Sequence, residues 1–162
     1  MIYPYIDYAV CALDISPYQE ETDLAKLTSL RKIEVWIDYD DHDDDGQHRS
    51  THGFGWFTQL LLSCSSTNER LEEMTIITRL GLAYQTIIDV IHGPWKNITA
   101  ALLGACFSGL KKLNIIFAHG YDIAICLGNI EAFKASEHMS KLRSRQGLDV
   151  NVTGYVNINR AS

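Results

Sequence analysis

Three segments of the chain share one pattern of hydrophobic and polar positions. Each reads leucine, two charged residues and then alternating apolar positions: LRKIEVWI at 30–37, LEEMTIIT at 71–78 and LKKLNIIF at 110–117. Apolar residues at every second position, many of them β-branched, are typical of a β-strand. The sequence therefore predicts strands near residues 31–38, 72–78 and 111–117. A looser copy, LDVNVTG from Leu148, predicts a fourth strand at 148–153, and AVCALDIS adds a candidate strand before the first copy.

The intervals between these strands carry apolar residues at helical spacing. The leading leucines Leu30, Leu71 and Leu110 recur at intervals of 41 and 39 residues, which indicates a repeated strand–helix unit. Pro94 is expected to stop the second helix from extending upstream. Gly147 is a natural stop for the third helix, predicted over 129–145. The apolar helical positions are Trp56, Phe57, Leu60, Leu61 and Cys64 in the first interval, Ile98, Leu102 and Cys106 in the second, and Ile130, Phe133 and Leu142 in the third.

Strand, helix and strand at this spacing imply parallel strands joined by right-handed crossover connections. The predicted fold class is therefore α/β, a parallel-stranded solenoid of about four degenerate strand–helix repeats. A chain of 162 residues has the length of one domain. We expect a single repeat domain over 1–162, with an acidic loop at 39–55 inserted after the first strand.

Net charge and cysteine usage narrow the classes of partner. The formal charge of −6 at pH 7 argues against nucleic acid, and the best basic candidate, Lys141 to Arg145, is short. The apolar runs fall far short of a membrane span, so no membrane partner is expected. The cysteines lie far apart among apolar neighbours, which favours buried thiols in a cytoplasmic or nuclear protein. They are Cys11, Cys64, Cys106 and Cys126.

The repeat also resembles a known family. The phrase L-x-x-L-x-L in LTSLRKIEV and FSGLKKLNI, together with GPWKNITAALLGACFSGLKKL before a strand, is similar to the leucine-rich-repeat-like C-terminal region of F-box proteins from mushroom-forming (basidiomycete) fungi. The resemblance covers roughly residues 10–154. In that family an N-terminal F-box docks on a cullin ubiquitin ligase, and the repeats select the substrate. No segment here resembles the F-box itself, so the resemblance implies a ubiquitin-ligase adaptor's recognition region, or a degenerate fragment without independent function.

One segment departs from the repeat, the acidic stretch DYDDHDDDGQHRSTHGFG at 38–55. Asp41, Asp43, Asp45 and the following glycine match the opening of a calcium loop, but its twelfth position is His52 instead of a bidentate glutamate. Histidines in the stretch could instead serve a transition metal such as zinc. The third interpretation, which we favour, is a solvated mobile loop that needs no cofactor, because runs of like charge repel one another.

No serine or cysteine stands on a tight turn with a histidine and an acid to activate it, which is the pattern that nucleophilic catalysis needs. Cys64 falls at the end of an amphipathic helix and is expected in the core. Gly53-Phe54-Gly55 lacks the length and the lysine of a phosphate loop. We therefore expect a non-enzymatic protein.

Aligning the predicted strands gives a candidate binding surface. If Ile33, Val35 and Ile37 face the helices, Trp36 faces the other way and forms one row with Ile77 and Ile116. An uncovered row of this kind would bind an unknown protein partner, and the uncovered repeat ends would favour self-association. The alternative is that the row is covered by a second layer, as in most parallel sheets. The candidate binding residues are Trp36, Ile77, Ile116, Glu34, Arg79 and Asn114.

Overall fold

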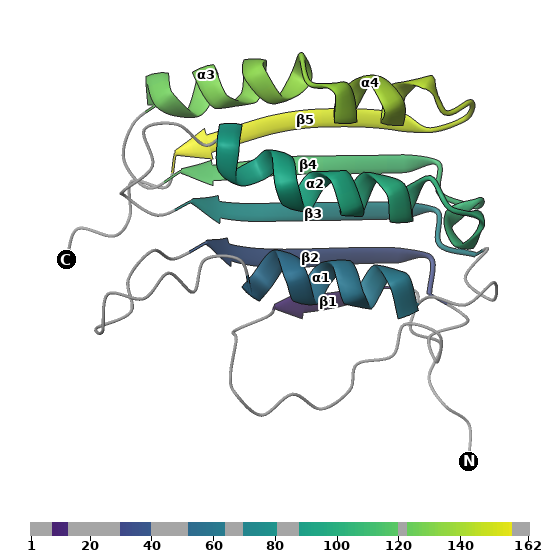
Figure 1. The fold of residues 1–162 in the computed structure, drawn as a ribbon. Helices are drawn as coiled ribbons and strands as arrows, with labels where there is room; N and C mark the ends of the chain where they lie inside the picture. The colour runs from purple at the N-terminus through teal and green to yellow at the C-terminus, as the bar shows by residue number, and fades with distance from the viewer. Residues whose placement is uncertain are drawn as a thin grey trace.

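A parallel sheet with its strands in chain order organises the molecule. In the computed structural model, the described residues are 8–12, 30–39, 52–63, 70–80, 88–119 and 123–156. The sheet has five strands in the order β1-β2-β3-β4-β5, and every neighbouring pair is parallel (Figure 1). The strands are β1 (Tyr8–Ala12), β2 (Lys32–Tyr39), β3 (Glu73–Leu80), β4 (Lys112–His119) and β5 (Asp149–Val156).

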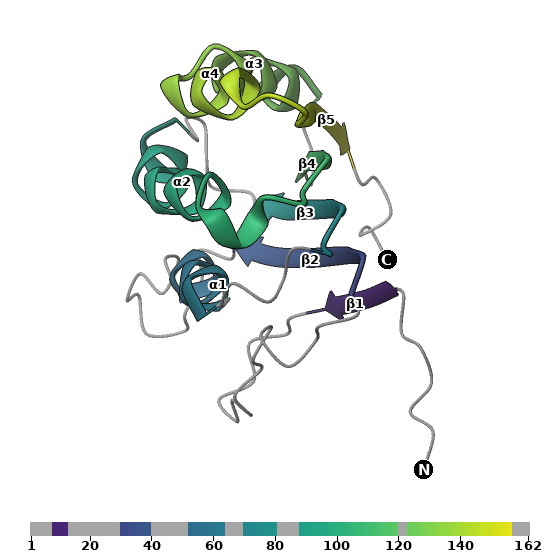
Figure 2. The same ribbon diagram turned by 90° about the vertical axis from the view of Figure 1, so that its right-hand side faces the viewer.

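The helices of the described chain lie on one side of this sheet, as Figure 2 shows. From β2 to β4, each strand is followed by one or two of these helices and then by the next strand, so each of these connections moves over by one position. The fold is therefore α/β with an all-parallel sheet, as predicted. The helices are α1 (His52–Ser63), α2 (Ile88–Leu102), α3 (Ile123–Lys134) and α4 (Glu137–Ser144), and a short 3-10 turn, η2 (Ala105–Phe107), follows α2.

The four repeat strands were predicted as parallel neighbours in this order, and that prediction is confirmed. Each strand begins one residue later than predicted and extends one to three residues further. The strands form where the sequence alternates between a buried face and a more exposed face. In β2, Ile33, Val35 and Ile37 are all at most 2% exposed, whereas Glu34 and Trp36 between them are half-buried on the other face. The AVCALDIS candidate corresponds to β1.

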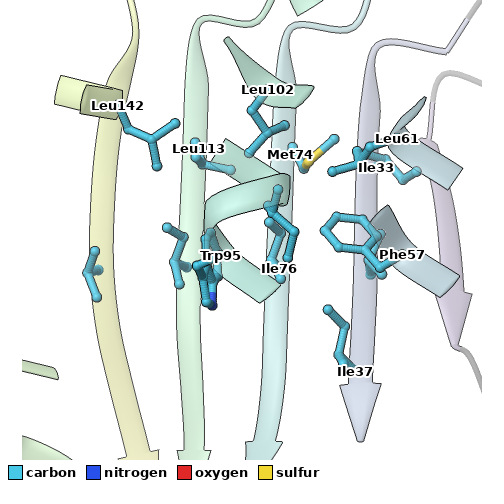
Figure 3. Packing of buried hydrophobic residues seen from close by; sticks show 14 of the residues in the cluster. Ile33, Ile37, Phe57, Leu61, Met74, Ile76, Trp95, Leu102, Leu113 and Leu142 are labelled. Carbon is cyan, nitrogen blue, oxygen red and sulfur yellow. The ribbon is translucent and has the colours of Figure 1, made fainter. Parts of the chain in front are cut away.

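The core fills the space between the sheet and the helices (Figure 3). Phe57 and Leu61 of α1 lie over the apolar side chains of β2, and Trp95 of α2 lies between β3 and β4. Trp95, Ile98 and Leu102 recur at positions i, i+3 and i+7 of α2, and each is fully buried. Trp95 meets Phe133 of α3 edge-on, with ring centroids 4.8 Å apart. Burial of this one-sided apolar face is what holds the helices on the sheet.

Two helix predictions were wrong. Helix α2 begins at Ile88 and runs through Pro94, which lies inside it. A proline costs the helix one hydrogen bond, and the buried face that follows Pro94 supplies tertiary packing that offsets this cost. The predicted helix over 129–145 is two helices, α3 and α4, because Ser136 interrupts it: its hydroxyl accepts a hydrogen bond from the Met139 amide at 3.3 Å and caps α4.

In the fourth copy of the repeat, the leucine lies one residue closer to its strand than in the other copies. Asp149 is in register with Lys112, so Leu148 takes the place of Lys111 and not of Leu110. Leu148 is nevertheless buried, at 8% exposure. The shortened connection turns at Gly147, whose φ of +81° is a conformation that glycine adopts without strain.

Candidate interaction surface

The face of the sheet opposite the helices carries its side chains in rows that cross the strands. We call it the helix-free face; none of the described helices covers it (Figure 2). The rows follow from the register, in which Lys32, Glu34 and Trp36 of β2 pair with Glu73, Thr75 and Ile77 of β3 and so on across the sheet. From the start of the strands onward the rows are charged (Lys32, Glu73, Lys112, Asp149), polar (Glu34, Thr75, Asn114, Asn151) and apolar (Trp36, Ile77, Ile116).

Glu73 occupies the centre of the charged row, between two lysines. Its carboxylate oxygens lie 2.9 Å from Lys32 Nζ and 3.2 Å from Lys112 Nζ. Hydrogen bonds from Lys32 and then from Lys112 hold the pKa of Glu73 below its ordinary value, against a smaller opposing effect of burial. These pairs join three strands, so they favour the observed strand order as well as the register.

The polar row is tied together by hydrogen bonds within the face. The Asn114 amide donates to Thr75 Oγ1 at 3.2 Å and to Glu73 Oε1 at 3.3 Å. The indole N–H of Trp36 donates to Glu34 Oε1 at 2.7 Å, which fixes the orientation of the ring on the sheet. Glu34 and Asn114, which were predicted as binding residues, therefore order this surface.

The predicted row of Trp36, Ile77 and Ile116 exists, since the three residues are direct register partners. Its members differ in exposure. Trp36 and Ile116 are half-buried, but Ile77 between them is only 5% exposed. A protein that contacts this row would meet Trp36 and Ile116, while Ile77 packs between its neighbours.

The next row holds Arg79, the remaining predicted binding residue. Arg79 pairs in register with Asp38 and Ala118, and its side chain lies outside the described part of the structure. Ala118 is 6% exposed. Tyr155 of β5 ends the row and is 42% exposed, which makes it the most accessible aromatic side chain described on this face.

The basic stretch considered for nucleic acid is engaged within the protein. Lys141 Nζ lies 2.6 Å from Glu137 Oε1, and Arg143 donates to the Lys134 carbonyl at 3.5 Å. Arg145 donates to the carbonyls of Leu102 at 2.8 Å, of Phe107, and of Leu110 at 3.5 Å. Burial lowers the pKa of its guanidinium. Arg145 thus holds the end of α2 and η2, whereas Lys141 and Arg143 remain exposed on α4.

The aspartates of the predicted metal site lie outside the described part of the structure. Asp41, Asp43 and Asp45 are not among the described residues. The acidic loop was predicted over 39–55, but residue 39 belongs to β2 and residues 52–55 belong to α1. Within the described ranges, no group of three or more potential metal ligands comes together.

The thiols can be placed in part. Cys126 is buried, as expected, and burial raises the pKa of its thiol. Cys106 is only half-buried. Cys64 and the side chain of Cys11 lie outside the described part.

Sequence reasoning missed the alternation of charge along the repeat. The two positions before each strand's alternating run are Arg31-Lys32, Glu72-Glu73 and Lys111-Lys112, and β5 starts with Asp149. The sign changes from each strand to the next, and Lys111 Nζ lies 2.8 Å from Glu72 Oε1 beside the charged row. The alternation was visible in the sequence and would have indicated that strands of opposite charge, such as β2 and β3, are neighbours.

Comparison with known proteins adds no family: no family model matches the chain, and no match is found among curated proteins or among solved structures. None of the helices in the described ranges has the length and apolar character needed to cross a membrane.

Proposed function

We propose that this chain is a non-enzymatic protein-interaction module that contacts a protein partner through the helix-free face. The observation that carries the proposal is the in-register apolar row, with Trp36 and Ile116 partly accessible. Tryptophan is enriched among the residues that dominate binding energy at interfaces. The ordered polar row beside it supplies hydrogen-bonding groups at the rim, the arrangement typical of protein interfaces.

The finer form of the proposal is a leucine-rich-repeat-like solenoid. Three features support it: strands in chain order, described helices on one face, and leucines that precede β2, β3, β4 and β5 and are buried at 2–8% exposure. The leucines are Leu30, Leu71, Leu110 and Leu148. By the resemblance noted above, the partner would be a substrate protein, and the module would be the recognition region of an F-box ubiquitin-ligase component.

A pair of tryptophan variants tests whether Trp36 is available for binding. Trp36→Ala should cost about 1–3 kcal/mol of unfolding free energy, because only part of the ring is buried. Trp95→Ala is the matched control, since Trp95 is fully buried and its loss should cost roughly 3–5 kcal/mol. Urea denaturation of both variants makes the comparison. Equal losses would show that Trp36 belongs to the core, and the proposal would then fail.

Binding is tested by affinity enrichment from extracts of the cells that make the protein. The bait variants are the double substitution Trp36→Ala with Ile116→Asn, on the helix-free face, and Lys96→Ala, at an exposed position of α2. A partner of this face should be lost with the first bait and retained with the second. If no enriched protein separates the two baits, the face is not the contact surface.

A further inference from the structure

The outer edge of β5 presents backbone groups that no described segment pairs with. The Asp149 amide donates to the Lys111 carbonyl at 2.8 Å, so this residue turns its backbone groups toward β4. Successive residues of a strand point these groups to opposite sides. Val150 and Val152 therefore direct their N–H and C=O outward, away from the sheet. Such an edge is a template for a further strand.

Exposure along β5 agrees with an outer edge that no described strand covers. On the inner strands the polar-row residues Glu34, Thr75 and Asn114 are half-buried, because strands flank them on both sides. Their register partner on β5, Asn151, is exposed, and so are Asp149 and Thr153 in the adjoining rows. A sixth strand would cover one side of each of them.

The charge at the edge specifies what such a strand would carry. Lys112 is engaged by Glu73, and Asp149 forms no ion pair among the described residues. The alternation of sign from β2 to β5 is positive, negative, positive, negative, so the position beside Asp149 on a sixth strand would be basic. A strand of that kind would repeat the pattern of β2 and β4, in which two basic residues precede alternating apolar residues.

We propose that the β5 edge binds an extended segment of a partner protein that begins with leucine and two basic residues and continues as an alternating apolar strand. The segment adds as a sixth parallel strand, with its second basic residue in register with Asp149. Its backbone bonds to Val150 and Val152, and its ammonium group pairs with the Asp149 carboxylate. This site lies at the edge of the sheet, at the end of the charged row, and its test does not depend on the partner proposed for the helix-free face.

A synthetic peptide with the sequence of residues 109–118 of this chain, carrying a fluorescent label, is the probe. The control peptide replaces its two lysines by glutamates. Anisotropy titration of the full chain should give about tenfold tighter binding of the lysine peptide, since cross-strand charge pairs differ by up to roughly 1 kcal/mol each in either direction. Asp149→Lys should reverse the preference, and Asp149→Asn should abolish it. Equal affinities of both peptides, or a preference that Asp149→Lys leaves unchanged, would overturn the proposal.

Residue-resolved hydrogen exchange shows where the peptide binds and whether the edge is free. The Val150 and Val152 amides should exchange rapidly in the free chain and about tenfold more slowly with the lysine peptide at ten times its Kd. The Asp149 amide, bonded to β4, is the internal control and should be protected throughout. Protection of Val150 and Val152 before the peptide is added would mean that another part of the chain, or a second copy of it, already covers the edge. Light scattering tells these two apart, and either result would refute the proposal.

Discussion

Replacing Gly154 by alanine tests how α3 is seated on β5. Gly154 lies on the side of β5 that faces the helices, in register with Phe117. A Cβ atom at this position would lie 2.4 Å from Ile130 Cδ1, 2.9 Å from the Phe117 carbonyl oxygen and 3.0 Å from Cys126 Sγ. The Ile130 methyl can rotate away, but the Phe117 carbonyl belongs to the backbone of the neighbouring strand and cannot. Helix α3 or strand β5 must therefore shift.

The expected cost follows from two opposing effects. Gly154 itself is exposed, but the added methyl group would press on the buried side chains of Ile130 and Cys126. Overpacking of this kind costs about 1–3 kcal/mol. Removing a glycine from the unfolded chain returns about 0.4–1 kcal/mol. Gly154→Ala should thus lower the free energy of unfolding by about 1–2 kcal/mol, which moves the urea midpoint down by roughly 0.5–1 M for a protein of this size.

Gly128→Ala is the matched control, because the same chemical change is made where the added Cβ meets no atom within 4 Å beyond its chain neighbours and the backbone of its own helix. Gly128 is exposed on α3, and alanine there should stabilise the protein by about 0.5–1 kcal/mol through helix propensity. Ile130→Val removes the closest atom and should recover part of the loss in the double variant. If Gly154→Ala is neutral or stabilising in urea denaturation, α3 does not pack on β5 as described.

Two further predictions concern charged groups. Lys32 and Lys112 depress the folded-state pKa of Glu73, so the stability that Glu73 contributes is present above pH 4.5, its ordinary pKa, and is lost as the pH falls through the lower folded value. Glu73→Gln should flatten this part of the stability–pH curve, measured by denaturation between pH 2 and 6, and an unchanged curve would contradict the ion pairs. Arg145→Met should lower the free energy of unfolding by about 2–4 kcal/mol, because its charge-assisted hydrogen bonds to the carbonyls at the end of α2 and η2 are lost. Arg143→Met is the control at an exposed position with one long hydrogen bond, and it should cost under about 0.5 kcal/mol. Similar losses of stability for the two variants in chemical denaturation would refute the role of Arg145 in binding these carbonyls.

The strands were predictable because their signal is local. In β2, the β-branched residues Ile33, Val35 and Ile37 at every second position define both the strand and its buried face without reference to any other element. The parallel order followed from the length of the intervals, which exclude hairpins. The row of Trp36, Ile77 and Ile116 could be aligned for the same reason, since it needs only the register.

What failed depended on tertiary packing or on competition within the backbone. Proline is unfavourable inside a helix, yet the fully buried face that includes Trp95 keeps α2 continuous through Pro94. The run of apolar residues suggested one long helix over 129–145. The Ser136 hydroxyl instead accepts a hydrogen bond from the backbone and caps α4, so a new helix begins there. The low exposure of Ile77 was not predictable either, because burial on the helix-free face depends on neighbouring side chains that strand periodicity does not describe.

The central claim, contact through the helix-free face, is tested most directly by site-specific photo-crosslinking in the cells that make the protein. A benzophenone amino acid is placed at position 36 in one variant and at position 96, an exposed site on α2, in the other. We predict a discrete crosslinked protein from position 36, with the partner's peptide identified by mass spectrometry, and none from position 96. The same crosslinked species from both positions, or none from position 36, would contradict the account.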